Sequence, residues 1–311
     1  MNRKNLTAAV LAGLAGVAGI ASTAQAVNIN PDGLGQVLLY PYYTVNGDNM
    51  TLLSIVNTTE EAKAVKVRFL ESENSVEVLD FNLYLSAYDV WTASIEEQPE
   101  GRMDDSCDPN PGDDTDVYCT GPVLVVNADE NSCMVPSFPK IQSFLPFAYM
   151  GDGGTQSQDR MNQGHFEMIE MGVLTDEGFD PENGATHGLV DGEWMPKDCA
   201  ALNSAWTLDA DEPEKAYWLI DNGEAIDPPT GGLYGGAGIV NVWEGALHTY
   251  EAIAINGWSV SGMVDDGLTS NHTYPGNLQP NLNSGDQLTG YVFSDNGIAL
   301  ASTSLTLSLI H

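Results

Sequence analysis

The strongest alternation of apolar and polar residues lies in the stretch from Gly33 to Ile95. Residues 65–70 read VKVRFL and residues 79–86 read LDFNLYLS, so every second side chain is apolar. Such period-two alternation is typical of a β-strand with one face in the core and the other in solvent. Polar turns at 57–61 and 73–75 separate the runs and predict consecutive antiparallel strands. This stretch therefore predicts the first strands of a β-sandwich.

The rest of the chain continues the β pattern between long polar loops. Residues 122–127 and 164–174 read as strands, whereas 176–199 reads as loop. Because few segments have helical spacing, the sequence predicts an all-β fold, an immunoglobulin-like β-sandwich with long irregular loops and insertions. The predicted organisation is N-terminal sandwich strands over 27–95, an acidic loop insertion over 96–120, and a continuation of this domain or a second β domain over 121–311.

The first 26 residues have the layout of a secretory signal peptide. Arg3 and Lys4 precede an apolar run rich in Ala and Gly, and the small-residue site Ala24-Gln25-Ala26 follows. The alternative, a membrane-spanning helix, needs about 20 apolar residues, which is more than this run offers. We therefore expect export to the periplasm, the cell surface or the medium, with no membrane span in the remaining chain.

The chain is strongly acidic, with 44 Asp and Glu against 10 Lys and Arg and a formal net charge of −34. Removing the predicted leader would take the charge to −36, because the leader holds two basic residues and no acidic one. Such a surface repels nucleic acid, whose phosphates require a basic face. Solubility in a salty medium, divalent-cation binding and attraction to a cationic partner are the readings that remain.

The four cysteines, an even number in an exported chain, predict two disulfides. Three pairings are possible, and we favour Cys107–Cys119 with Cys133–Cys199 because the first closes a short local loop. Zinc ligation is the alternative, but neither a CxxC motif nor a paired His spacing accompanies these residues.

The acidic insertion presents closely spaced oxygen ligands around a glycine, the chemistry that Ca²⁺ selects. The run lacks the spacing and the terminal Glu of an EF-hand, so a solvated acidic loop is the alternative. A weaker group of the same kind follows at residues 176–183. The candidate calcium ligands are Asp108, Asn110, Asp113, Asp114 and Asp116.

Two further motifs invite a chemical interpretation. On a strand, His165 and Glu167 share a face and could bind a metal or act as acid and base. The simpler reading is an ion pair of Arg160 with Glu167 or Glu170, because a charge buried in a sheet needs a partner. The glycine run at 231–238 lacks both the following helix and the Lys of a phosphate-binding loop, which favours a glycine hairpin or bulge.

Several motifs together resemble a family of uncharacterised exported proteins of Gram-negative bacteria, labelled only as hypothetical or cell-surface proteins. These motifs are GLGQVLLYPYYTV, NTTEEAKAVKVRFLES, VLDFNLYLSAYDVWTASI, GHFEMIEMG and PTGGLYGGAGIVNVWEG, and they span roughly Val27 to Ile255. The resemblance implies secretion and a shared architecture, but no activity and no site residues. The strand-like end of the chain could pair with a partner and so favour self-association.

These observations predict an exported acidic β-sandwich that acts as a surface or extracellular structural or adhesive component, with self-association or a surface glycan as partner. We lean away from an enzyme because neither GxSxG nor HExxH occurs. The alternatives are a secreted polysaccharide hydrolase or lyase near His165 and Glu167, and a periplasmic metal- or ligand-binding module. An enzyme predicts a deep cleft at that pair, and an adhesive protein predicts exposed sheet edges.

Overall fold

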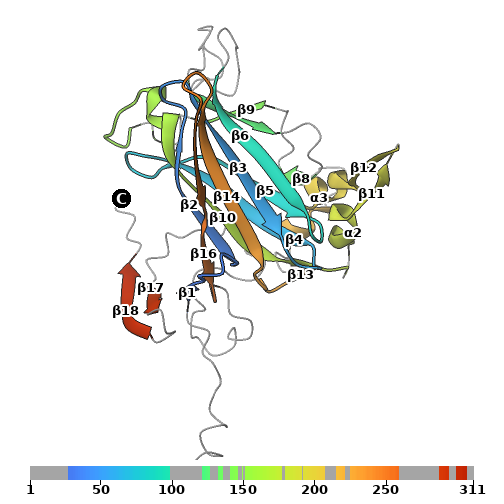
Figure 1. Cartoon of the computed structure of the whole chain (residues 1–311). Coiled ribbons are helices and arrows are strands. Elements are labelled where there is room, and N and C mark those ends of the chain that lie inside the picture. Colours follow the sequence, from blue (N-terminus) through green and yellow to red (C-terminus); the bar gives the residue numbers. More distant parts are fainter. Residues whose placement is uncertain are drawn as a thin grey trace, which may run out of the picture.

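Two antiparallel β-sheets lie face to face in the computed structural model and form a sandwich (Figure 1). The prediction of an all-β sandwich with long irregular loops is confirmed. No helix in the described part is long and apolar enough to cross a lipid bilayer. The structure describes residues 27–98, 121–126, 132–135, 141–145, 149, 151–176, 179–190, 192–206, 215–220, 225–258, 287–293 and 299–306.

Among these residues, one large sheet has eight strands and the other has six. The eight-stranded sheet runs in the order β1 (Asn28–Ile29), β16 (Ile253–Asn256), β2 (Val37–Thr44), β10 (Gln163–Leu174), β4 (Lys63–Glu71), β5 (Glu77–Leu85) and β8 (Cys133–Val135), with β13 (Ile226–Asp227) also paired to β10. The six-stranded sheet runs in the order β15 (Ala246–Glu251), β14 (Leu233–Asn241), β3 (Asn49–Asn57), β6 (Val90–Glu97), β7 (Pro122–Val126) and β9 (Ile141–Ser143).

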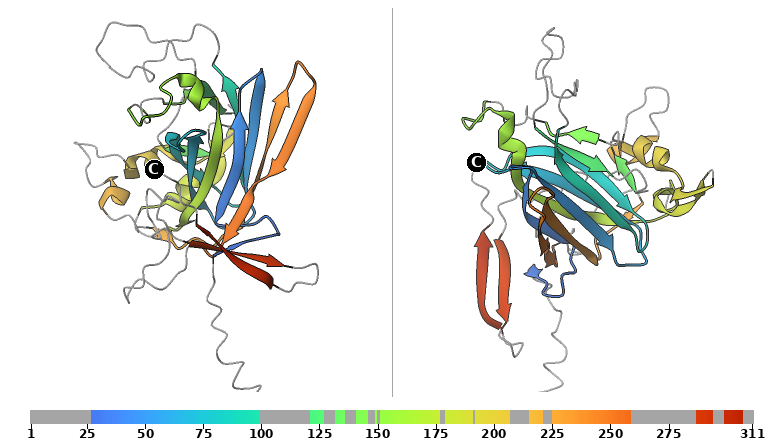
Figure 2. Two further views of the ribbon diagram at one scale, coloured as in Figure 1. Left: turned by 90° about the vertical axis from the view of Figure 1, so that its left-hand side faces the viewer. Right: turned by 45° about the horizontal axis from the view of Figure 1, so that its top comes forward.

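The main core fills the space between the two sheets (Figure 2). Tyr40 and Phe166 stack there with ring centroids 4.2 Å apart, and Trp91 enters from the six-stranded sheet. These aromatic side chains are completely buried and dominate the apolar area removed from water. Strands from 37–97 and from 122–256 contribute to both sheets, so the two stretches share this core.

The predicted alternation is present in β4 and β5. Val65, Val67 and Phe69 point into the core, as predicted, and β4 pairs with β5 through the turn at 73–75. The turn at 57–61 differs from the prediction, because it carries the chain from β3 in one sheet to β4 in the other. β4 is also buried on both faces rather than on one, so its charged side chains need partners.

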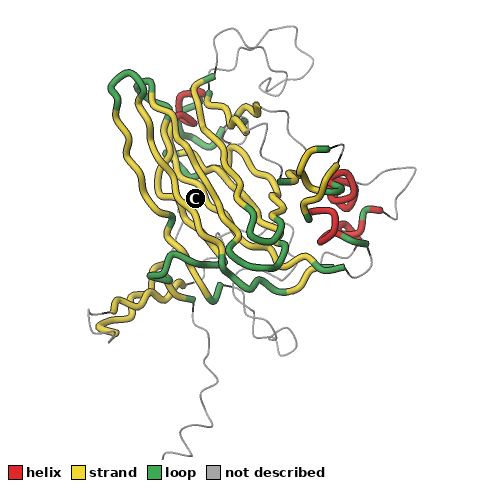
Figure 3. Tube along the Cα trace, turned by 45° about the vertical axis from the view of Figure 1, so that its right-hand side comes forward, coloured by secondary structure: helices red, strands yellow, loops and turns green. Residues whose placement is uncertain are grey.

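A small helical unit covers one end of the outer face of the eight-stranded sheet (Figure 3). Its core places Trp218 against Tyr84 of β5, with parallel rings 5.7 Å apart. The Cys133–Cys199 disulfide, confirmed here, joins it to edge strand β8. Its elements are α2 (Pro181–Ala185), α3 (Cys199–Trp206), α4 (Tyr217–Ile220) and the hairpin β11 (His187–Val190) with β12 (Glu193–Pro196).

The loop predicted over 176–199 is therefore partly wrong, because α2 and a hairpin form within it. Pro181 starts α2 and Asp180 caps it, a local signal that apolar periodicity does not detect. Two elements complete the described chain: the 3₁₀ turn η3 (Gln158–Asn162), which leads into β10, and the hairpin of β17 (Gln287–Phe293) with β18 (Ala299–Thr306).

Candidate functional site

Within the described part of the chain, four basic residues are buried and paired with carboxylates. They lie in two settings, on the outer face of the eight-stranded sheet and at the two ends of the interior. Burying a charge is costly unless it is paired, so each of these cations fixes a carboxylate in the sheet. The four are Lys63, Lys66, Arg68 and Arg160.

The outer face carries a ladder of opposite charges across three strands. Lys66 pairs with Asp80 of β5, while Arg68 bonds both Glu77 of β5 and Glu167 of β10. Burial raises the pKa of the Glu167 carboxyl to about 7, against the opposing effect of Arg68. The Glu167 side chain is therefore part of this ladder.

The predicted pairing of Arg160 with Glu167 or Glu170 is wrong. Arg160 lies in η3, before β10 begins, and antiparallel pairing places that end of β10 beside the end of β4 at Glu71. Arg160 Nη2 accordingly lies 2.8 Å from Glu71 Oε1 and 2.6 Å from Asp152 Oδ2. The prediction chose carboxylates that are close to Arg160 in the sequence, on β10. The pairing of β10 with β4 instead brings Glu71 of β4 next to Arg160.

Glu71 and Glu170 are buried at opposite ends of the interior, and each carboxylate is bound by one cation and by backbone N–H groups. Burial acts to raise the pKa of Glu71, but Arg160 and backbone N–H groups of the 73–76 turn hold it below its ordinary value. Glu170 accepts from Lys63 Nζ at 2.7 Å and from the backbone of Thr230 and Gly231 at 3.0 and 2.8 Å. Glu170 and Lys63 therefore hold the backbone in place just before β14 begins.

His165 and Glu167 are placed two residues apart on β10, opposite Leu70 and Arg68 of β4. Burial, followed by the nearby Arg68 cation, lowers the pKa of His165. Across the described ranges, no three His, Cys, Asp or Glu side chains converge closely enough to hold a metal ion. The weaker acidic group at 176–183 is partly explained by Asp180, whose carboxylate caps α2.

Other candidates lie outside the described residues. They are the leader over 1–26, the cysteines Cys107 and Cys119, and the five calcium candidates Asp108, Asn110, Asp113, Asp114 and Asp116.

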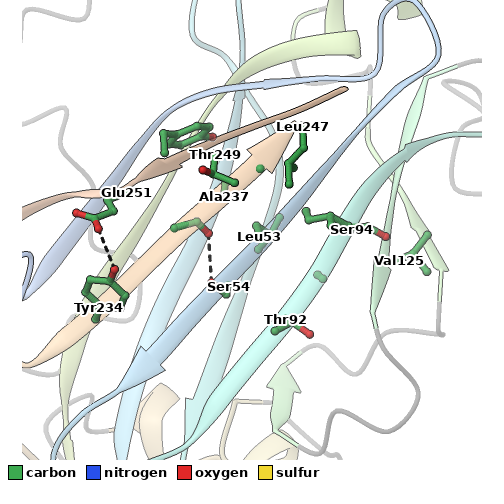
Figure 4. Close-up of a pocket in the computed structure, with 15 residues that line it drawn as sticks. Leu53, Ser54, Thr92, Ser94, Val125, Tyr234, Ala237, Leu247, Thr249 and Glu251 are labelled. Carbon is green, nitrogen blue, oxygen red and sulfur yellow. Dashed lines mark hydrogen bonds between the residues drawn. The ribbon is translucent and has the colours of Figure 1, made fainter. Parts of the chain in front are cut away.

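An open groove of about 1030 Å³ lies on the outer face of the six-stranded sheet (Figure 4). Strands β15, β14, β3 and β6 form most of it. Leu247 on β15 and Leu52 on β3 line it and are 61% and 44% exposed. A groove of this volume is large enough for a small ligand or a segment of a polymer.

Two glycines on β14 make the floor of the groove. Strand register places Gly238 between Thr249 and Leu52, and Gly236 between Glu251 and Ser54. Neither glycine has a positive φ, so backbone conformation does not require glycine here. Gly236 is half-buried in the groove, whereas Gly238 is buried beside the side chains of Leu247 and Thr249.

Gly235, between these two residues in the chain, has a different role. It faces the interior, where a Cβ would lie 1.9 Å from the Tyr40 hydroxyl, which donates to the Ser54 carbonyl at 2.8 Å. A Cβ at Gly238 would lie 3.3 Å from the Leu247 side chain and 3.4 Å from the Thr249 side chain, and the nearest backbone atom would be the His248 carbonyl oxygen at 3.8 Å. Gly235 is therefore needed for packing, while Gly236 and Gly238 shape the surface.

The groove combines apolar side chains, hydroxyl groups and one charge. Tyr234 Oη donates to Glu251 Oε1 at 3.3 Å, and Ser54 Oγ donates to the Gly236 carbonyl at 3.3 Å (Figure 4). Among the lining residues only Glu251 is charged, although the chain has 44 acidic residues. Thr92 and Ser94 of β6 add two more hydroxyl groups.

The sequence interpretation missed this groove, although part of its signal is visible in the sequence. Gly236 and Gly238 occur two residues apart and share a strand face with Tyr234. The pairing of β14 with β3, almost 200 residues earlier, cannot be read from that spacing.

Comparison with known proteins finds no matching family model, no matching curated protein and no matching solved structure.

Proposed function

We propose that this protein is an exported surface or extracellular component of structural or adhesive type, and that it binds an uncharged polysaccharide along the groove. The observation that carries the proposal is the open and nearly uncharged groove over β14 in a chain of formal charge −34. An exposed surface with apolar and hydroxyl groups in such an acidic chain is suited to a neutral partner.

The chemistry of the lining supports a sugar as that partner. Sugar rings present apolar C–H faces and a rim of hydroxyl groups, so they use aromatic surfaces together with hydrogen-bonding groups. The Tyr234 ring supplies the aromatic surface, and the Glu251 carboxylate is a strong hydrogen-bond acceptor beside it. An anionic polysaccharide is disfavoured by the charge of the whole chain.

Filling the floor tests the proposal most simply. Ser54→Phe places a ring in the space above Gly236, whereas Val90→Phe places the same ring on an exposed position of β6 outside the groove. We expect Ser54→Phe to weaken binding at least about tenfold, because the ring displaces ligand contacts. We expect Val90→Phe to bind like the wild type.

The measurement is affinity electrophoresis and sedimentation with soluble and insoluble neutral glucans, and a matched anionic polysaccharide shows whether charge is discriminated. Circular dichroism and thermal unfolding confirm that both variants fold. Unchanged binding by Ser54→Phe, or the absence of binding to every neutral polysaccharide, would contradict the proposal.

Calcium binding by the acidic insertion is a separate part of the proposal. It is supported by the oxygen ligands from Asp108 to Asp116 in the sequence. Light scattering of the purified protein with calcium and then with chelator tests it. We expect assembly that appears with calcium and reverses with chelator. Light scattering that neither calcium nor chelator changes would contradict calcium binding by the insertion.

A further inference from the structure

The four strands at the ends of the two large sheets differ sharply in length. β1 has two residues, and β8 and β9 have three each, whereas β15 has six. Very short edge strands are one way in which proteins prevent pairing with other chains, and Pro and Lys on an edge are others. β15 reads ALHTYE and has neither Pro nor Lys. It is therefore the least protected of these four edges.

Side chains on both faces of β15 are exposed, although Tyr250 packs against the main core. Leu247, His248, Thr249 and Glu251 are exposed, and the hairpin tip that precedes the strand exposes Trp243 by 85%. The β14–β15 hairpin (orange) lies at one margin of the sandwich in Figure 2. A second strand can therefore approach along its free side.

The hydrogen-bond alternation shows which backbone groups face that free side. The N–H of Ala252 donates to the carbonyl of Gly235, and the Tyr250 carbonyl also lies against β14, 3.0 Å from a Cβ placed on Gly236. Alternate residues of an antiparallel strand bond to opposite neighbours. Leu247, Thr249 and Glu251 therefore direct their N–H and C=O groups away from β14.

We propose that a second copy of this chain pairs with β15 in antiparallel register, about a two-fold axis at Thr249. This axis places Thr249 opposite its own equivalent, a favourable cross-strand pair. It also places Glu251 opposite the second copy's Leu247, so no two carboxylates face each other. The dimer joins the two six-stranded sheets and brings their grooves side by side. This inference does not require that the groove bind a sugar.

Removal of one edge donor tests the pairing without disturbing the fold. Thr249→Pro deletes an N–H that β14 does not use, and the symmetry deletes it twice in the dimer. We expect its dissociation constant to rise about tenfold or more, while Thr249→Val, which retains the N–H, associates like the wild type. Size-exclusion chromatography with light scattering over a concentration series, without polysaccharide, measures both variants. Thermal unfolding checks that they are folded.

Single cysteines test the register. Directly opposed, hydrogen-bonded residues lie about 5.5 Å apart between Cα atoms, within disulfide range. Under mild oxidation we expect Thr249→Cys to form a covalent dimer alone, identified by mass spectrometry of the joined peptides. Leu247→Cys and Glu251→Cys should cross-link only when the two variants are mixed.

Three results would overturn the proposal: a wild-type chain that stays monomeric at every concentration, a dimer that Thr249→Pro leaves intact, or equal cross-linking at all three positions. The Ser54→Phe variant separates the two proposals. It lies on β3, away from the edge, and should dimerise normally even where it abolishes sugar binding.

Discussion

The outer faces of the two sheets use charge in opposite ways. The eight-stranded sheet has its outer charges buried in a ladder through Lys66, Arg68 and Glu167, and a helical unit covers one end of it. The six-stranded sheet lines its groove with glycines, hydroxyl groups and leucines, and Glu251 is the only charged residue among them.

This difference indicates which surface of a strongly acidic chain can contact another molecule. Among the described residues, four buried cations neutralise carboxylates within the fold, so they hold one sheet together instead of balancing the surface. Contact with a neutral partner or with a second acidic copy then requires a face with few carboxylates. The outer face of the six-stranded sheet meets that requirement, and the predictions below test each side of the comparison.

The largest effect is expected when a buried cation is removed from the eight-stranded sheet and the residues packed at its end. Arg160→Met leaves Glu71 buried without its partner, and we expect a loss of about 3–5 kcal/mol in the free energy of unfolding. Lys197→Met is the matched control, because Lys197 is exposed and its loss should cost less than about 0.5 kcal/mol. Urea denaturation measures both. Equal losses would show that the buried pair has no special role.

Reduction of the Cys133–Cys199 disulfide comes next. The bridge closes a loop with a sequence separation of 66, for which chain entropy predicts about 4 kcal/mol of stabilisation. Because it joins β8 to α3, its loss should loosen the helical unit and leave the groove intact. Polysaccharide binding and unfolding of a Cys133→Ala/Cys199→Ala variant measure the two effects separately. A groove that loses binding while the sandwich stays folded would contradict this separation.

Two nearby glycines on β14 are expected to differ in how much stability is lost when each is replaced by Ala, and both losses are smaller than those above. Gly235→Ala forces a Cβ against the Tyr40 hydroxyl and should destabilise the fold by about 1–3 kcal/mol. Gly238→Ala places its Cβ 3.3 and 3.4 Å from side-chain atoms of Leu247 and Thr249, with no backbone clash, and should change stability by less than about 0.5 kcal/mol. Thermal unfolding distinguishes them. If Gly238→Ala is the more damaging of the two, the assignment of their roles is wrong.

The last effect is a pH dependence from Glu167. Its pKa is raised from 4.5 to about 7 by burial, so between these values the folded state binds a proton that the unfolded state has released. Stability therefore falls as pH rises from about 4.5 through 7. Glu167→Gln should flatten this slope in part, since burial also raises the pKa of Glu170. Asp32→Asn, on the surface, is the control, and an unchanged slope in Glu167→Gln would refute the prediction.

The local pattern predicts the strands well, because the alternation in β4 and β5 marks the side chains that face the main core. The same pattern predicts neither the crossing from β3 to β4 nor the burial of Lys66 and Arg68, since both depend on what packs from elsewhere. The partner of Arg160 was predicted wrongly for the same reason, because the pairing of β10 with β4 selects Glu71.

The candidate site is less predictable than the fold. Its floor on β14 shows a period-two glycine signal, but the groove exists only because β14 pairs with β3 and β15 in one register. Cys133–Cys199 was predicted correctly from parity and loop length, and the structure joins it across β8 and α3. Local chemistry is therefore readable from the sequence wherever it does not depend on distant register.

Hydrogen exchange of the intact chain, with and without a neutral polysaccharide that it retains, tests the central claim most directly. We expect new protection of amides confined to β3, β6, β14 and β15, the strands that form most of the groove. Protection that appears instead on β4, β5 and β10, or only in the acidic insertion, would contradict the assignment of the six-stranded sheet as the binding surface.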